Sequence, residues 1–308
     1  MTLKNYLGTS FNQDILTTLS LVDTLIKPIL LYASDFWGAL KLPRSNPIEN
    51  LHMMMCKQVL GVQKQTTNVG VLLELGRIPM HLYASKFAIK NWERIKQGQA
   101  NSVLRASYQD SVDENLPWTK GVKSILETNG MLNFYMNDYT GKPPFIYEKL
   151  FQRLSDSFHQ NSFESMKTES SKLRTYAVFK TNIGCEKYLS EVKNVSVRTH
   201  VTKFRLSNHR LMIEVGRYNG TPREERFCPF CPHKIENEPH FLFECSLFNA
   251  QRAYLQDPII NTIPGFTNLS EDLKLQLLLS KMEPNMCIYI ANCCELRMFF
   301  ESKPKRLS

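Results

Sequence analysis

Three cysteines and one histidine between residues 227 and 245 constrain this chain more than any other feature. In the stretch FCPFCPHKIENEPHFLFEC they are spaced as Cys228-x2-Cys231-x8-His240-x4-Cys245. The first pair suits a tight turn whose two thiolates reach one ion at about 2.3 Å, and the last pair is separated by little more than one helical turn. Three sulfurs and one imidazole nitrogen make a closed tetrahedral set that favours zinc and leaves no position for a catalytic water. The spacing therefore predicts a structural Zn²⁺ site.

Other interpretations of the cysteines and histidines stay open at this point. The cysteines of the stretch can also simply pack in a core, because cysteine is often buried. His233 is a competing ligand, but it follows Cys231 by two residues and would strain the turn. The remaining cysteines are isolated or lie in an apolar segment without a nearby histidine, so we expect them to pack as small apolar residues. These are Cys56, Cys185, Cys287, Cys293 and Cys294.

The start of the sequence and its longest apolar stretch indicate in which cellular compartment the protein lies and whether it enters a membrane. MTLKNYLGTSFNQ lacks the apolar core and the cleavage site of a secretory signal. We therefore expect an intracellular protein with reduced cysteines, in the nucleus or the cytoplasm. The stretch ILTTLSLVDTLIKPILLYA contains Asp23 and Lys27. Central charges are costly in lipid, so this stretch predicts a buried or kinked helix and no membrane partner.

A basic segment precedes the cysteine cluster. The whole chain has 38 Lys and Arg against 29 Asp and Glu, and residues 171–226 contain twelve basic residues against five Glu. Clustered cations suit phosphate contacts, and Tyr218 and Phe227 between them suit stacking on unpaired bases. We therefore predict binding of RNA or single-stranded DNA, with an ordinary solvated helix face as the alternative. The candidate contacts are Arg198, Lys203, Arg205, Arg210, Arg217, Arg223 and Arg226, of which the first and third share a helix face.

Helical periodicity in the front third predicts a mainly α fold. Pro28 is expected to kink or break the first periodic stretch. Pro47 suits the first position of a helix, and Gly61 suits the left-handed residue that follows its last turn. Residues 1–97 are therefore expected to form one helical unit. Its predicted helices lie at residues 12–38, 47–60 and 80–96.

Three further regions follow in the sequence. Residues 98–117 are polar and weakly periodic, which indicates a linker, and residues 118–195 are predicted to be a helical connecting region. Residues 196–308 are predicted to be a basic zinc-knuckle domain with C-terminal helices. Within this domain, apolar and other residues alternate from Leu211 to Gly216, which is the period of a half-buried strand. We therefore expect a small β-hairpin that delivers the first cysteine pair.

Several separated motifs resemble the reverse transcriptases of non-LTR (LINE-type) retrotransposons. KLRTYAVFKTNIGCEKYL, FRLSNHRLMIEVGRYNGTPREERFCPFC and IENEPHFLFECSLFNAQR resemble their C-terminal zinc-binding segment. LIKPILLYASDFWG and IENLHMMMCKQVLGVQKQTTNVGVLLELGRIPM look like the region that follows the polymerase palm, which makes residues 1–97 thumb-like. The resemblance covers nearly the whole chain in the family's order. It implies that the basic segment helps hold the element's RNA or its target DNA, and that the zinc ligands are Cys228, Cys231, His240 and Cys245.

The sequence departs from this family where polymerase chemistry is concerned. The family's Tyr-x-Asp-Asp motif and its partner aspartate, which hold two magnesium ions, have no counterpart here. FYMNDY at residues 134–139 has Asn137 where the first aspartate would stand, and the endonuclease module of many relatives is missing. We therefore expect a nucleic-acid-binding fragment that is not an enzyme, with any polymerase domain supplied in trans. The alternatives are a zinc-stabilised protein-interaction scaffold, or a relic reading frame without a selected role.

Overall fold

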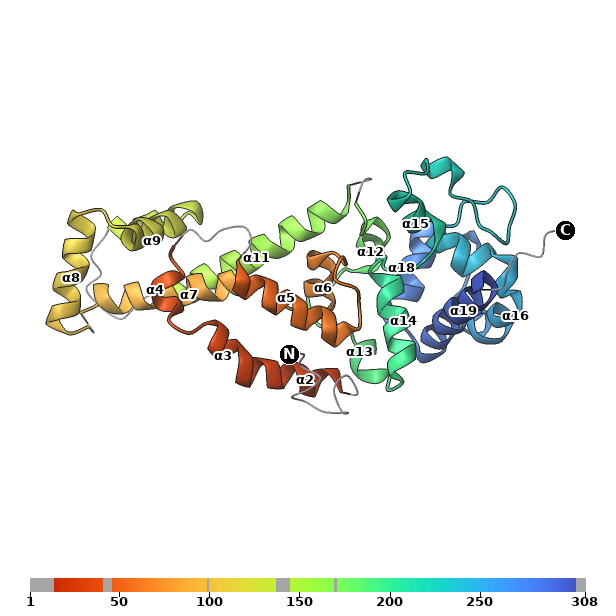
Figure 1. The fold of residues 1–308 in the computed structure, drawn as a ribbon, viewed down its shortest axis with the longest axis horizontal. Coiled ribbons are helices and arrows are strands. Elements are labelled where there is room, and N and C mark those ends of the chain that lie inside the picture. The colour runs from red at the N-terminus through yellow and green to blue at the C-terminus, as the bar shows by residue number, and fades with distance from the viewer. Residues whose placement is uncertain (1–13, 41–45, 99, 137–144, 169–170, 303–308) are drawn as a thin grey trace. The chain divides into compact units, whose positions relative to one another are not determined.

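A computed structural model describes residues 14–40, 46–98, 100–136, 145–168 and 171–302 (Figure 1). This part of the chain is mainly α-helical, as predicted, and it contains no β-strand. Two isolated β-bridges join Leu75 to Cys185 and Phe227 to Ile235. The expected β-hairpin is therefore wrong for the described residues. No helix within them combines the length and the apolar character needed to cross a membrane.

Helices follow one another along the whole described chain (Figure 1). The first group contains α2 (Ile15–Leu21), the π-helical η2 (Val22–Ile26), α3 (Lys27–Leu30), α4 (Ser34–Trp37), α5 (Pro47–Leu60), α6 (Asn68–Glu74), α7 (Met80–Lys96), α8 (Ser102–Asp113), α9 (Pro117–Thr128), α10 (Leu132–Met136) and α11 (Ile146–Met166). The second group contains α12 (Arg174–Phe179), α13 (Tyr188–Glu191), α14 (Val195–Arg205), α15 (Met212–Tyr218), η3 (Arg223–Glu225), η4 (His240–Glu244), η5 (Ser246–Phe248), α16 (Asn249–Gln251), η6 (Arg252–Gln256), α17 (Asp257–Ile260), η7 (Phe266–Asn268), α18 (Glu271–Lys281) and α19 (Pro284–Ser302).

Proline and glycine set several helix boundaries as the sequence predicts. Helix α5 begins at Pro47 and ends before Gly61, which has the left-handed φ of 65° expected after a last turn. Helix α7 has the predicted bounds, Met80–Lys96. The first periodic stretch changes to the π-helical η2, which ends two residues before Pro28, because a proline ring removes a donor and crowds the preceding turn.

The described chain forms two compact units, each assembled from separate stretches of sequence. The first unit draws on Met1–Leu19, Met55–Arg77 and Phe163–Ser308, and the second on Ser20–Met54 and Ile78–Ser162, as far as these are described. The four consecutive regions expected from the sequence differ from this division, and their boundaries stay a prediction.

The second unit has an apolar core between α7, α9 and α11. Trp92, Val122 and Leu150 are all buried there. The buried Glu93 carboxylate accepts hydrogen bonds from the backbone N–H groups of Ile146, at 3.1 Å, and Tyr147, at 3.2 Å. These are donors that the first turn of a helix leaves unpaired, so Glu93 fixes the start of α11 against α7.

The polar segment expected as a linker contains helix α8. Asn101 caps this helix, since its side chain accepts a hydrogen bond of 2.8 Å from the Leu104 N–H. The hydroxyl of Tyr108 accepts a hydrogen bond of 3.1 Å from the indole of Trp92. Helix α8 within this segment is therefore stabilised by a cap and by a tertiary contact, and neither can be inferred from the weak apolar periodicity.

The stretch predicted as a strand, Leu211–Gly216, instead contributes to helix α15. The Glu236 carboxylate accepts a hydrogen bond of 2.6 Å from the Met212 N–H and so caps the helix start. A side chain added at Gly216 would clash with Arg226, because its Cβ would lie 2.7 Å from the arginine Cγ. Tertiary contacts from distant sequence thus override the alternation of residue types over a few positions.

A buried ionic cluster lies at the centre of the first unit. Arg205 from α14 contacts the carboxylates of Glu74, at 2.6 Å, and Glu186, at 2.8 Å, and all three side chains are buried. The hydroxyls of Tyr176 and Tyr188 donate to Glu74 at 2.7 and 2.6 Å. Burial alone would raise the pKa of the Glu74 carboxyl, but the Arg205 charge outweighs it and holds that pKa below its usual value. The cluster joins α6, α13 and α14 through paired charges.

Removal of Arg205 should leave the buried Glu74 carboxylate without its paired cation, while Glu186 keeps its ion pair with Lys180 at 2.5 Å. We expect Arg205→Ala to lower the free energy of unfolding by about 3–5 kcal/mol, as found when one partner of a buried pair is removed. Urea unfolding followed by circular dichroism measures the change. The control is Arg210→Ala, which removes an exposed arginine and should change stability by no more than about 0.5 kcal/mol. Equal unfolding midpoints for the two variants would contradict the assignment.

Candidate metal centre

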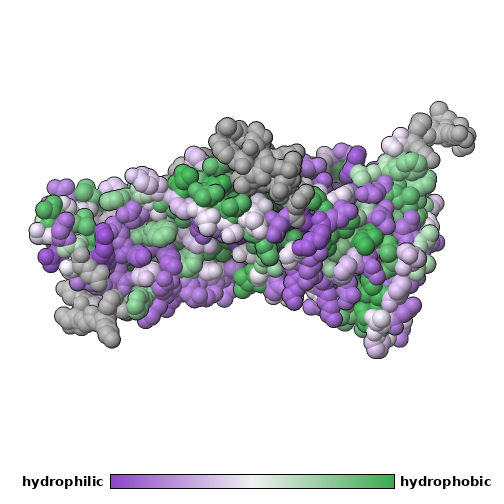
Figure 2. All heavy atoms as spheres, turned by 90° about the horizontal axis from the view of Figure 1, so that it is seen from below, coloured by the Kyte–Doolittle hydropathy of each residue, from purple (hydrophilic) through white to green (hydrophobic). Residues whose placement is uncertain are grey.

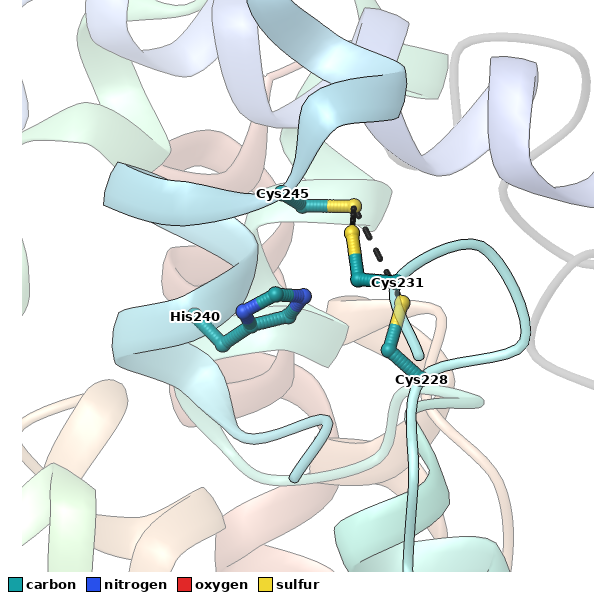
Figure 3. Close-up of side chains that lie close together, drawn as sticks. All are labelled: Cys228, Cys231, His240 and Cys245. Atoms are coloured by element: carbon teal, nitrogen blue, oxygen red, sulfur yellow. Dashed lines mark hydrogen bonds between the residues drawn. The ribbon is translucent and has the colours of Figure 1, made fainter. Parts of the chain in front are cut away.

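Cys228, Cys231, His240 and Cys245 converge on one point in the first unit (Figure 3). Their potential ligand atoms all lie within 4.8 Å of one another. The Cys245 sulfur is 3.9 Å from that of Cys228 and 3.8 Å from that of Cys231. Three of the residues are buried, and Cys231 is partly exposed. A buried Cys3His set of this kind is compatible with a structural metal ion such as Zn²⁺.

A tight turn presents the first two cysteines. The Cys228 N–H donates to the carbonyl of Lys234 at 2.7 Å, and the β-bridge between Phe227 and Ile235 closes the base of the turn. His233 lies on this turn with a left-handed φ of 59° and is exposed. Its ring packs edge-on near Phe227, at 6.2 Å between centroids, and it is no member of the four-residue cluster.

A single π-helical turn brings the other two ligands together. The Asn237 side chain accepts a hydrogen bond of 2.8 Å from the His240 N–H and so starts η4. The Cys245 N–H then donates to the His240 carbonyl at 2.9 Å. This five-residue spacing of donor and acceptor is that of a π-helix, and it places both side chains on the same side. The separation of His240 and Cys245 by little more than one helical turn thus corresponds to a short π-helix in the structure.

The His240 ring is oriented for ligation through one nitrogen. Its Nδ1 lies 3.5 Å from the Glu244 carboxylate. Its Nε2 is buried and has no hydrogen-bond partner in the described part of the chain. Buried polar atoms are almost always paired, so an orphaned Nε2 beside three sulfurs fits a position on a metal ion. A carboxylate on the other nitrogen is the usual arrangement for a metal-binding histidine.

The metal-free sulfurs compete for protons. A hydrogen bond from Cys245 holds the pKa of Cys228 at about 4, although burial opposes this. The same contact raises the pKa of the Cys245 thiol. Burial lowers the pKa of His240, but the neighbouring Cys228 sulfur outweighs it and raises that pKa to about 9. The cluster therefore favours negative sulfur next to a cation, which is the charge pattern that a divalent metal satisfies.

Two glutamates in the loop between the ligand pairs anchor it to the rest of the first unit. Glu236 forms two hydrogen bonds of 2.8 Å with Arg297 of α19, and both side chains are buried. Glu238 contacts His209 at 3.3 Å and Arg174 at 3.5 Å. Burial would raise the pKa of Glu238, but His209 and Arg174 hold it at about 2. The sequence alone does not predict these anchors, because a Glu-x-Glu in a polar loop has no local pattern that reveals a buried partner.

Hydrogen bonds from two later side chains fix the backbone around His240 and Cys245. Arg252 donates to the carbonyls of Phe243, at 2.6 Å, and Cys245, at 2.7 Å. The Tyr289 hydroxyl donates to the Leu242 carbonyl at 2.9 Å. Because both donors come from later helices, the ligand positions depend on the packing of η6 and α19 in the first unit.

The predicted nucleic-acid contacts divide into buried and exposed residues. Arg198 and Arg205 are buried, so the helix face that they share is the inner face of α14. Arg198 donates to the Val192 carbonyl at 2.9 Å, and Arg205 is held in the ionic cluster. Arg226 is half-buried and donates to the carbonyls of Thr221 and Ile213. These three guanidinium groups form hydrogen bonds or ion pairs inside the protein, so they are not available for phosphate contacts in this conformation.

The remaining candidates are accessible. Arg210 and Arg223 are exposed, while Lys203 and Arg217 are partly exposed. Arg210 approaches Glu301 at 4.0 Å, and Arg217 contacts Glu214 at 3.4 Å. The four residues are spread over α14, the connection that follows it, α15 and η3 instead of forming one stripe.

The FYMNDY stretch lies partly outside the described residues. Its first three residues, Phe134 to Met136, end helix α10. Within the described residues, the only grouping of metal-binding side chains is the Cys3His cluster.

Comparison with known proteins gives no match: no protein-family model, no curated protein and no solved structure is similar to this chain. The resemblance to non-LTR reverse transcriptases therefore stays a prediction that rests on the motifs alone.

Loss of one sulfur should weaken the metal site and the fold around it. Since binding of a structural zinc contributes directly to folding, we expect Cys231→Ser to lower zinc content below one per chain and to destabilise the first unit by several kcal/mol. Elemental analysis and thermal unfolding measure the two effects. The matched control is Cys185→Ser, which removes a partly exposed thiol outside the cluster. Identical zinc content and melting curves for both variants would refute the site.

Proposed function

We propose that this chain is a zinc-stabilised module that binds RNA or single-stranded DNA, and that it is a retrotransposon-derived relative of the C-terminal part of non-LTR reverse transcriptases. The observation that carries the proposal is the Cys3His cluster, because it fixes a turn that displays cations and aromatic rings to solvent. Zinc knuckles that present such residues are a common means of holding single strands.

Residues around the zinc turn have the chemistry that this binding needs. Lys234 lies on the turn itself with 63% of its side chain exposed, and Arg210 has 73% exposed. Tyr218 and Phe227 are large exposed rings in the same segment. Bases can stack on such rings irrespective of sequence, while the cations contact phosphates. Glu224 and Glu225 directly follow Arg223 and reduce the local positive charge, so the contacts are best tested residue by residue.

The metal in this proposal supplies structure and no reaction. Three sulfurs and one nitrogen would fill a tetrahedral site, which leaves no open position for a substrate or an activated water. The polymerase activity of the family would then come from a separate polymerase domain acting in trans.

A protein-interaction scaffold is the second candidate. Leu25, Ile29, Tyr32 and Phe36 are large apolar side chains close together in the sequence, and all of them are exposed. Figure 2 shows apolar residues gathered in patches at the surface on the face drawn. Exposed apolar groups of this kind are typical of interaction surfaces. In this candidate function, zinc has the same structural role, but the exposed Lys and Arg side chains bind no nucleic acid.

Binding to RNA should depend on salt and on the exposed cations. We expect a labelled single-stranded RNA to bind the zinc-loaded chain with an affinity that falls steeply with salt, as measured by fluorescence anisotropy. Arg210→Ala/Lys234→Ala should reduce the slope of log affinity against log salt by about 0.7 for each phosphate that the variant no longer neutralises. Lys120→Ala/Lys123→Ala is the matched control, because both lysines are exposed on α9 of the second unit. No binding at low salt would favour the scaffold instead.

A further inference from the structure

The second unit contains a cavity of about 870 Å³ that the proposed function does not use. Its walls come from η2 and α3, from α4, from one face of α7 and from the start of α11, and all of these segments belong to the same unit. Ligand sites in proteins usually have volumes of about 300–1,000 Å³ and combine apolar walls with a few polar groups. This cavity has both features.

The wall formed by α7 carries positive charge. Lys90 and Arg94 are one helical turn apart on the cavity side, and both are exposed. Neither forms an ion pair with a carboxylate of the described residues. Arg94 donates to the Asn91 side chain at 2.9 Å, which holds the guanidinium in place, and the Lys90 ammonium lies 5.5 Å from the centre of the Tyr147 ring. Two neighbouring cations without a carboxylate partner are suited to bind a phosphate.

Aromatic rings border the cavity next to these cations. Phe145 is 59% exposed and Phe87 is 37% exposed, and both line the cavity together with Tyr147. The rings of Phe145 and Tyr147 pack edge to face, with 6.4 Å between their centres. An exposed face of Phe145 at the rim offers a stacking surface for a flat heterocycle.

One carboxylate of the cavity lining, that of Asp35, can accept N–H groups of a ligand. Asp23 lies on η2 and Asp35 on α4, and both contribute to the lining. The third acid, Glu93, is committed to the start of α11 through the N–H groups of Ile146 and Tyr147. The backbone carbonyl of Asp35 accepts the Trp118 indole N–H at 3.1 Å, and its carboxylate takes part in no ion pair within the described residues.

We propose that this cavity binds a purine nucleotide whose base has N–H donors. The phosphate would contact Lys90 and Arg94, the base would stack on Phe145, and its N–H edge would donate to Asp35. A free nucleoside monophosphate and the 5′-terminal nucleotide of a strand share this chemistry. The site lies in the second unit, so the inference does not depend on zinc or on the proposed binding of RNA by the first unit.

Isothermal titration of the full chain with guanosine 5′-monophosphate tests this site. We expect binding that weakens about tenfold or more in Lys90→Ala/Arg94→Ala, since the phosphate then lacks two charge-assisted hydrogen bonds. Guanosine, which lacks the phosphate, should bind both proteins equally. Lys120→Ala/Lys123→Ala removes the same charge outside the cavity and should leave nucleotide binding unchanged. No binding of the nucleotide at millimolar concentration, or equal binding by the two double variants, would overturn the proposal.

Two further titrations test which base the site prefers and whether it accepts the end of a strand. Asp35→Asn should abolish the preference for guanosine monophosphate over xanthosine monophosphate, which lacks the exocyclic amine; an unchanged preference would contradict the role of Asp35. A 5′-phosphorylated guanosine dinucleotide should bind as tightly as the free nucleotide if the site takes a strand end, and more weakly if it takes only the monomer. Either result supports a nucleotide site, provided that Lys90→Ala/Arg94→Ala weakens it.

Discussion

Three sulfurs and one imidazole within 4.8 Å of one another form the constraint on which the loop of residues 227–245 depends. Without a cation, the sulfurs have to share protons, and the pKa of Cys228 falls to about 4. A divalent ion at this cluster would remove the conflict and would link the cysteine turn to η4. Glu236 and its buried partner Arg297 then fix the same loop to α19. The position of the exposed Lys234 on this loop thus depends on the Cys3His cluster and on the Glu236–Arg297 pair.

Buried charge explains why a basic sequence does not give a continuous basic surface. Residues 171–226 have an excess of positive charge, yet Arg205 and Lys180 are buried in ion pairs with Glu74 and Glu186 inside the first unit. The helical period shows which residues share a face. When those residues are charged, it does not show whether that face is buried or exposed to solvent. The number of exposed cations is therefore smaller than the composition suggests, and Arg210 and Lys234 are two of them.

The features predictable from the sequence are those with local causes. The four ligand positions, the mainly helical fold and the bounds of α5 and α7 follow from spacing, proline, glycine and periodicity. Helix α15 could not be predicted, because Glu236, which caps it, lies 24 residues away in the sequence. The cavity of the second unit likewise joins segments that no local pattern connects. Long-range contacts thus explain why the predicted strand Leu211–Gly216 is helical. They also form the cavity, which no sequence motif indicates.

X-ray absorption at the zinc edge of the purified full chain tests the metal site most directly. The geometry predicts one zinc ion per chain with three sulfur neighbours at about 2.3 Å and one nitrogen at about 2.0 Å. His240→Ala should replace that nitrogen shell by oxygen or release the ion, while His233→Ala should leave the spectrum unchanged, because His233 lies outside the cluster. A zinc-free protein that is equally stable in chelator, or a first shell without sulfur, would contradict the central claim.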